Sequence, residues 1–190
     1  MSQKIKTITI YASASPRISS VYFEAAGNLG KLLAEHSIAC VNGGGLNGLM
    51  GAVTNAVLEN GGNVCGVIPQ FMYDKGWLHP SIRDVIITPD MHSRKQTMAA
   101  KSDACIALPG GVGTLEELLE IITWKQLGLY KNPIVILNTA GYYDFLLAML
   151  RKADQENFIH SKSTVWQVAS APEEALELLQ MQPETNLLWN

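Results

Sequence analysis

The chain has 190 residues, of which 47% are hydrophobic and 16% are charged, and its formal net charge is -3. A chain of this length can bury one real core, so we expect a single domain spanning residues 1–190. This weakly acidic net charge gives no basic surface for general nucleic-acid binding, and no segment reaches the roughly 18 apolar residues of a membrane span. We therefore expect a cytoplasmic protein with neither nucleic acid nor membrane as a partner.

Strand and helix patterns alternate along the first half of the chain. Apolar periodicity predicts, in order, a strand at 5–11, a helix at 21–36, a strand at 38–41, a helix from a glycine turn at 42–51 to about residue 59, and a strand at 63–68. Residues 70–83 contain Pro80 and three aromatic side chains. We expect a long loop there, and long loops in compact domains are often functional.

The alternation continues to the end of the chain. The pattern predicts strands at 85–88, 104–108, 133–137 and 164–168, with helices at 92–101, after the turn at 109–114, at 142–154 and at 173–181. Strands that alternate with helices favour an α/β fold in which a parallel sheet is covered on both faces. The three cysteines, Cys40, Cys65 and Cys105, lie in apolar segments without metal-site spacing, so we expect buried, reduced thiols and no metal.

Three turns rich in glycine or serine follow predicted strands, at 12–20, 42–51 and 109–114. In parallel α/β sheets, ligands bind outside the carboxyl ends of the strands, where the strand order reverses. We therefore expect one pocket to gather these three turns. Gly43 to Gly48 matches G-x-G-x-x-G, but no acidic residue ends the next strand, and neither glycine turn has the Gly-Lys-Ser/Thr of a P-loop.

The stretch from Leu108 to Glu117 reads Leu-Pro-Gly-Gly-Val-Gly-Thr-Leu-Glu-Glu. A glycine turn that opens a helix leaves backbone N–H groups free at the positive end of the helix dipole, which suits a phosphate or another anion. Two interpretations of Glu117 stay open. Thr114 and Glu117 have the spacing of a capping box, or a carboxylate here acts beside a bound sugar phosphate.

Arg94 and Lys95 lie near the start of a predicted helix, where cations are mildly unfavourable against the helix dipole. This placement indicates either an anionic partner or a solvated surface pair. His92 beside them is more typical of a structural residue at a helix start.

Taken together, these motifs resemble those of the LOG family, the cytokinin riboside 5'-monophosphate phosphoribohydrolases that were long labelled lysine decarboxylases. The resemblance covers about residues 8–159. Its motifs are Gly43-Gly44-Gly45 with Gly48-Leu49-Met50-Gly51, Gly66-Val67-Ile68-Pro69, Met91-His92-Ser93-Arg94-Lys95, Pro109-Gly110-Gly111-Val112-Gly113-Thr114-Leu115-Glu116-Glu117, Ile122-Thr123-Trp124 and Gln126-Leu127-Gly128.

The resemblance implies a Rossmann-like, doubly wound fold and a homodimer that cleaves the N-glycosidic bond of a nucleoside 5'-monophosphate without a cofactor. It implies that Arg94 and Glu117 are the catalytic pair. The residues expected to bind substrate are Ser13, Gly44, Gly45, Lys95, Gly110, Gly111, Val112, Gly113, Thr114, Glu116 and Thr123. The alternative is a carrier or sensor of the same superfamily that binds a nucleotide-like ligand without cleaving it.

Two positions depart from the family pattern. Many relatives carry a glutamate where this chain has Gly76, and Cys-Gly-Ser-Ser where it has Ala12-Ser13-Ala14-Ser15. The resemblance therefore leaves the base open between AMP and a prenylated adenine nucleotide.

Overall fold

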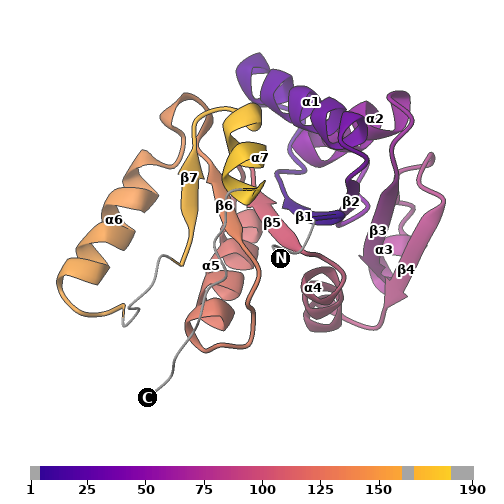
Figure 1. Ribbon diagram of the computed structural model, residues 1–190. Coiled ribbons are helices and arrows are strands. Elements are labelled where there is room, and N and C mark those ends of the chain that lie inside the picture. The colour runs from indigo at the N-terminus through magenta and orange to yellow at the C-terminus, as the bar shows by residue number, and fades with distance from the viewer. Residues whose placement is uncertain (1–4, 160–164, 181–190) are drawn as a thin grey trace.

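A seven-stranded parallel sheet forms the centre of the computed structural model, which describes residues 5–159 and 165–180 (Figure 1). The strand order is β4-β3-β2-β1-β5-β6-β7. The strands are β1 (Thr7–Tyr11), β2 (Ala39–Asn42), β3 (Val64–Pro69), β4 (Asp84–Thr88), β5 (Ala104–Ala107), β6 (Ile134–Leu137) and β7 (Gln167–Ala169).

Helices cover both faces of the sheet, as the alternating pattern predicts. One face packs against α1 (Ser20–Glu35), α2 (Gly48–Glu59) and α7 (Pro172–Gln180). The other packs against α4 (Met91–Ala100), α5 (Val112–Gln126) and α6 (Asp144–Gln155). Two apolar cores result, one on each side of the strands, and Figure 1 shows α1 and α7 on the opposite side of the sheet from α4 and α5.

The inner strands are apolar along their whole length rather than alternating. Every residue of β3, β5 and β6 is buried, because a strand covered on both faces exposes neither set of its side chains to water. Cys40, Cys65 and Cys105 are free thiols within these cores, which confirms the prediction of buried, reduced cysteines.

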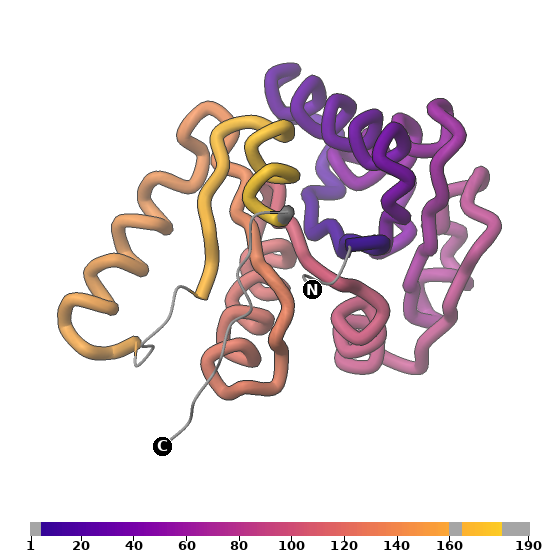
Figure 2. Tube along the Cα trace, viewed as in Figure 1, coloured from indigo at the N-terminus to yellow at the C-terminus, as the bar shows by residue number. Residues whose placement is uncertain are grey.

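The strand order reverses between β1 and β5. The first four strands run outward from β1 on one side, and the chain then returns through α4 to place β5 on the other side of β1 (Figure 2). The loops after β1, β2 and β5 therefore meet at one edge of the sheet, at the point where ligands bind in this class of fold.

The structure differs from the expected elements in residues 70–83 and near the end of the chain. The expected loop begins with a short helix, α3 (Gln70–Asp74), which a side-chain hydrogen bond of 2.7 Å from Gln70 to Asp74 closes. Strand β7 begins three positions later than expected, at Gln167; the predicted strand start at 164 and helix end at 181 lie outside the described residues. In the described part of the chain, no helix is both long and apolar enough to cross a membrane.

Candidate active site

A pocket of about 550 Å³ opens at the carboxyl edge of the sheet. Its walls include Ala12, Ser13 and Ala14 after β1, Gly43, Gly45, Leu46 and Asn47 after β2, and Gly111, Gly113 and Thr114 at the start of α5. This confirms the expectation that one pocket gathers the three turns.

Backbone hydrogen bonds join the three turns to one another through Ser13. The Ser13 N–H donates to the carbonyl of Pro109 at 3.4 Å, and the Ser13 carbonyl accepts from the N–H of Met50 at 3.2 Å. The Ser13 hydroxyl accepts from the N–H of Ser15 at 3.0 Å, which closes the first turn on itself. The walls of the pocket are therefore held in fixed relative positions without any ligand.

Helix α5 begins at the pocket with its N–H groups uncapped. Gly111 is the N-cap residue, and no side chain caps the helix. A Cβ atom at Gly110 would lie 2.1 Å from Thr114 Oγ1, so this tight entry into the helix requires glycine. The uncapped N–H groups and the helix dipole make this end of the pocket suitable for a phosphate.

Two adjacent tyrosines after β6 hold the carbonyl groups of the same turn. The hydroxyl of Tyr142 donates to the carbonyl of Gly110, and that of Tyr143 donates to the carbonyl of Leu108, each at 2.7 Å. The sequence reasoning missed both residues; the available signal was a pair of tyrosines a short turn after an apolar strand. Their hydroxyls bind the carbonyls of the turn and leave its N–H groups available to a ligand.

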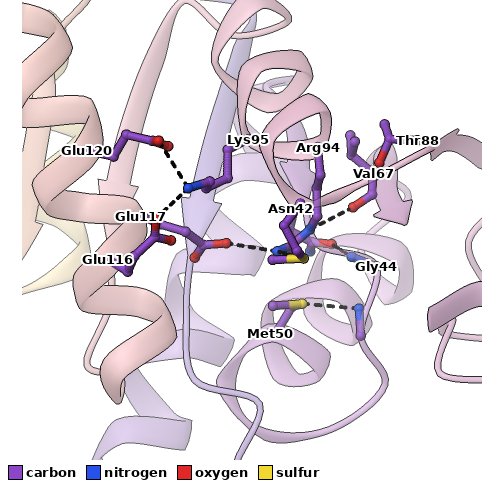
Figure 3. A network of polar contacts seen from close by, with 12 residues as sticks. Asn42, Gly44, Met50, Val67, Thr88, Arg94, Lys95, Glu116, Glu117 and Glu120 are labelled. Carbon is purple, nitrogen blue, oxygen red and sulfur yellow. Dashed lines mark hydrogen bonds and ion pairs between the residues drawn. The ribbon is translucent and has the colours of Figure 1, made fainter. Parts of the chain in front are cut away.

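Glu117 does not form a capping box with Thr114. Thr114 is the third residue of α5 rather than its N-cap, so the capping interpretation is wrong. The carboxylate points instead to Arg94 on α4, with 3.1 Å between Glu117 Oε1 and Arg94 Nη1 (Figure 3). Arg94 Nε also donates to the carbonyl of Val67 within β3, at 3.1 Å.

The Arg94–Glu117 pair is buried yet lines the pocket. Arg94 is 6% exposed and Glu117 is 7% exposed, so the interpretation of Arg94 as part of a solvated surface pair is wrong. Burial raises the pKa of Glu117, an effect that the nearby charge of Arg94 opposes. A carboxylate with a raised pKa is a stronger base than an ordinary glutamate, and it faces a space that a substrate can enter.

Lys95 lies behind this pair rather than in the pocket. Its ammonium is buried between Glu116 and Glu120 of α5, and the distance to Glu120 Oε1 is 3.0 Å (Figure 3). Burial lowers the pKa of Lys95, but its hydrogen bonds to the two carboxylates more than offset this, so the net pKa is raised. The sequence reasoning missed Glu120, which stands one helical turn after Glu116. The cluster ties α4 to α5 and thereby fixes the distance between Arg94 and Glu117.

The structure brings some of the expected substrate-binding residues into the pocket wall and leaves others outside it. Those that line the pocket are Ser13, Gly45, Gly111, Gly113, Thr114 and Glu116. Those that do not are Gly44, Lys95, Gly110, Val112 and Thr123. Val112 is 85% exposed, and the hydroxyl of the exposed Thr123 donates back to the carbonyl of Leu119.

Gly43 leaves room for the guanidinium group of Arg94. A Cβ atom at this position would lie 1.8 Å from Arg94 Nη2. We predict that Gly43→Ala displaces the guanidinium from Glu117 and lowers kcat/KM about 100-fold, the scale of a 1 Å misplacement in an active site. Gly27→Ala is the control, because a Cβ there meets nothing within 4 Å. An active Gly43→Ala enzyme would show that the position of Arg94 is not critical.

The remaining wall of the pocket is apolar. It is formed by the side chains of Leu46, Met50, Ile68, Met72, Trp77 and Met91. The sequence reasoning placed the aromatics of this region in a loop but did not assign this wall. The pocket thus has an anion-binding end, a buried ion pair and an apolar end.

The family described as "Possible lysine decarboxylase" matches residues 50–179 of the chain. Cytokinin riboside 5'-monophosphate phosphoribohydrolase LOG7 of Arabidopsis thaliana is 41% identical over 98% of this chain and 89% of its own length. The probable cytokinin riboside 5'-monophosphate phosphoribohydrolase LOGL6 of Oryza sativa subsp. japonica is 42% identical over 95% of this chain and 72% of its own length.

Solved structures of the same fold are more distant in sequence. The molybdenum cofactor carrier protein of Chlamydomonas reinhardtii superposes with a TM-score of 0.69 at 20% identity, covering 93% of this chain and 97% of that protein. The protein TM1055 superposes with a TM-score of 0.71 at 20% identity, covering 93% and 99%. These likenesses confirm the Rossmann-like fold. The family match and the relatives above 40% identity show that the chain belongs to the LOG family of phosphoribohydrolases.

Proposed function

We propose that the protein hydrolyses the N-glycosidic bond of an adenine-type nucleoside 5'-monophosphate, releasing the free base and ribose 5-phosphate. The observation that carries this proposal is the buried Arg94–Glu117 pair, which lines a pocket beside the uncapped start of α5. An anion-binding turn and a basic carboxylate within one pocket suit a substrate that carries a phosphate and a reactive sugar carbon.

In this mechanism the 5'-phosphate binds the N–H groups at the start of α5. The turn from Gly110 to Thr114 forms the cradle, so the binding energy of the phosphate holds the ribose in place. The anomeric carbon of the ribose then faces Glu117. Gly111, Gly113 and Thr114 already line the pocket and contribute to this cradle.

Glu117 acts as a general base in the proposed reaction. The C–N bond breaks and its electron pair leaves with the base, while the ionised carboxylate stabilises the positive charge that develops on the sugar. The carboxylate then takes a proton from a water molecule as the water oxygen bonds to the anomeric carbon, and this proton passes to the departing base. The charge of Arg94 favours the ionised form of Glu117, because it opposes the larger effect of burial, which raises the pKa of that carboxyl.

Lysine decarboxylation, the activity in the description of the matching family, has no equivalent support in the pocket. A pyridoxal phosphate enzyme needs a lysine to form a Schiff base. Among the described residues, the two buried lysines lie outside the pocket lining, Lys95 between two carboxylates and Lys125 on the carbonyl of Asn132 at 2.7 Å. The relatives above 40% identity are named phosphoribohydrolases.

We further propose that the chain works as a single-domain homodimer in the cytoplasm. Leu127 and Leu129, which follow the last residue of α5, are exposed, and exposed apolar side chains suit a contact between copies of the chain. The three free thiols suit a reducing compartment.

The experiment that tests the proposed reaction separates nucleotides from nucleosides. We expect the purified protein to release free base from at least one adenine nucleoside 5'-monophosphate but none from the same nucleoside without phosphate, because the phosphate anchors the substrate on α5. Chromatography of the products over a panel of monophosphates measures this. If the protein binds a monophosphate and releases no base from any, the carrier or sensor alternative replaces the enzyme.

A further inference from the structure

The segment after α3 forms one side of the apolar end of the pocket. Gly45 and Leu78 form an antiparallel bridge, and the N–H of His79 donates to the carbonyl of Gly44 at 2.7 Å. In an antiparallel pair, the residues next to a bridged pair lie opposite one another. Leu46 and Trp77 therefore lie opposite one another across this bridge.

The bridge also determines which way Trp77 points. Leu78 packs against the apolar core, and successive side chains of an extended segment point to opposite sides. Trp77 therefore points away from the core, and its side chain lines the pocket together with Leu46. Trp77 is 50% exposed and Leu46 is 46% exposed, so both side chains present apolar surface that a ligand in the pocket can cover.

The side chain of His79 anchors this segment from behind. Its Nε2 hydrogen-bonds Asn55 Oδ1 of α2 at 3.0 Å, and its Nδ1 accepts from the N–H of Ser81 at 3.2 Å. His79 is buried. Trp77 is thus attached to α2 and to the second glycine turn, so it forms a wall in a defined place rather than a loose loop.

One face of the Trp77 indole is occupied by a neighbour. The ammonium of Lys75 lies 5.0 Å from the centre of the indole and 5.8 Å from the ring of Phe71. A cation over one face of an aromatic ring leaves the opposite face available for stacking. Gly76, which has φ +70°, also lines the pocket and adds no side chain to it.

We propose that Trp77 is a specificity-determining residue for the base: its indole, opposite Leu46, is the surface on which the base of the nucleotide stacks. This inference rests on the proposed function, because the phosphate at α5 and the sugar at Glu117 direct the base to the remaining, apolar end of the pocket. A purine overlaps the indole over two fused rings and a pyrimidine over one, so the wall favours purine nucleotides.

Affinities measured in the Glu117→Gln background, where hydrolysis is suppressed, test the proposal. Titration calorimetry compares AMP, UMP and ribose 5-phosphate, of which the last has no base. We expect Trp77→Ala to lower the affinity for AMP about 10-fold, to lower the affinity for UMP less, and to leave the affinity for ribose 5-phosphate unchanged. The reason is that stacking of a base on an aromatic side chain contributes on the order of a tenfold change in affinity or more. Trp77→Phe should retain most of the affinity for AMP.

Phe71→Ala is the matched control. Phe71 is also an exposed aromatic that contacts Lys75, but it does not line the pocket, so its loss should leave all three affinities unchanged. If Trp77→Ala loses as much affinity for ribose 5-phosphate as for AMP, the proposal is overturned in favour of a structural role for Trp77. If Trp77→Ala leaves the affinity for AMP unchanged, the proposal is overturned outright. If AMP binds in this pattern but the unaltered protein releases no base from any adenine nucleoside 5'-monophosphate, the proposed reaction is refuted and the role of Trp77 is still supported.

Discussion

Replacing Glu117 with glutamine should lower kcat/KM about 1,000-fold while the protein stays folded. General base catalysis contributes roughly 10²- to 10⁴-fold, and an amide cannot accept the proton. The amide oxygen still accepts a hydrogen bond from Arg94, and a neutral side chain avoids the cost of burying a charge, which is what raises the pKa of Glu117. Base release measured by chromatography, with circular dichroism and thermal melting of the same sample, checks both parts.

Glu120→Gln is the control for this substitution. Glu120 lies on the same helix and pairs with Lys95 at 3.0 Å, but it does not line the pocket. We expect its activity to stay within about twofold of the unaltered enzyme, because Glu116 still pairs with Lys95 and the amide oxygen at position 120 can still accept from the ammonium, so α4 stays tied to α5. If Glu117→Gln mainly lowers the melting temperature and base release persists, the carboxylate is structural and the proposed mechanism fails.

Removing Arg94 should damage both stability and catalysis. Arg94→Ala leaves the buried carboxylate of Glu117 without its partner, which costs about 3–5 kcal/mol of unfolding free energy for a pair of this kind. Arg94 lowers the pKa of Glu117 against the effect of burial, so its removal raises that pKa further. Chemical denaturation measures the free energy of unfolding of the single variant Arg94→Ala and of the double variant Arg94→Ala/Glu117→Gln. The double variant should be the more stable of the two, because it has no unpaired buried carboxylate.

The Arg94–Glu117 pair also determines how the stability lost in Arg94→Ala depends on pH. A carboxyl group whose pKa is raised in the folded state contributes stability below its unfolded pKa, and this stability is lost as pH rises through the folded pKa. Arg94→Ala should therefore lose more stability relative to the unaltered protein at pH 8 than at pH 5. The acidic limb of its residual kcat/KM should also move to higher pH. A cost that does not vary with pH would show that Arg94 contributes packing rather than charge.

Much of the fold follows from local patterns in the sequence. The buried strands at 104–108 and 133–137 are runs of apolar residues, and the glycine turn at Pro109 to Thr114 marks a strand end and a helix start. Their order along the chain then predicts the parallel sheet and the edge at which the turns meet. Helix α3 was missed because Pro80 and the aromatics of 70–83 resemble a loop, and five residues give too short a period to recognise.

The site was less accessible to sequence reasoning than the fold, because its contacts join distant parts of the chain. Spacing alone favoured a capping box at Thr114 and Glu117, whereas the helix begins earlier, at Val112, and Glu117 reaches Arg94 on another helix. The burial of Arg94 depends on the space above Gly43 and on the carbonyl of Val67. None of these long-range contacts has a local signature.

The reversal of strand order between β1 and β5 places the two members of the ion pair on opposite sides of the seam between β1 and β5. Arg94 lies on the helix that returns from β4 and bonds to β3, while Glu117 follows β5. During refolding, β1 can pair early with β2, because only α1 separates the two strands in the sequence. Strand β5 is separated from β1 by β2, β3, β4 and their helices, and strand pairings that close such long loops are slow. Recovery of base release should therefore lag behind recovery of helical signal, because the catalytic centre is complete only when β5 has paired with β1.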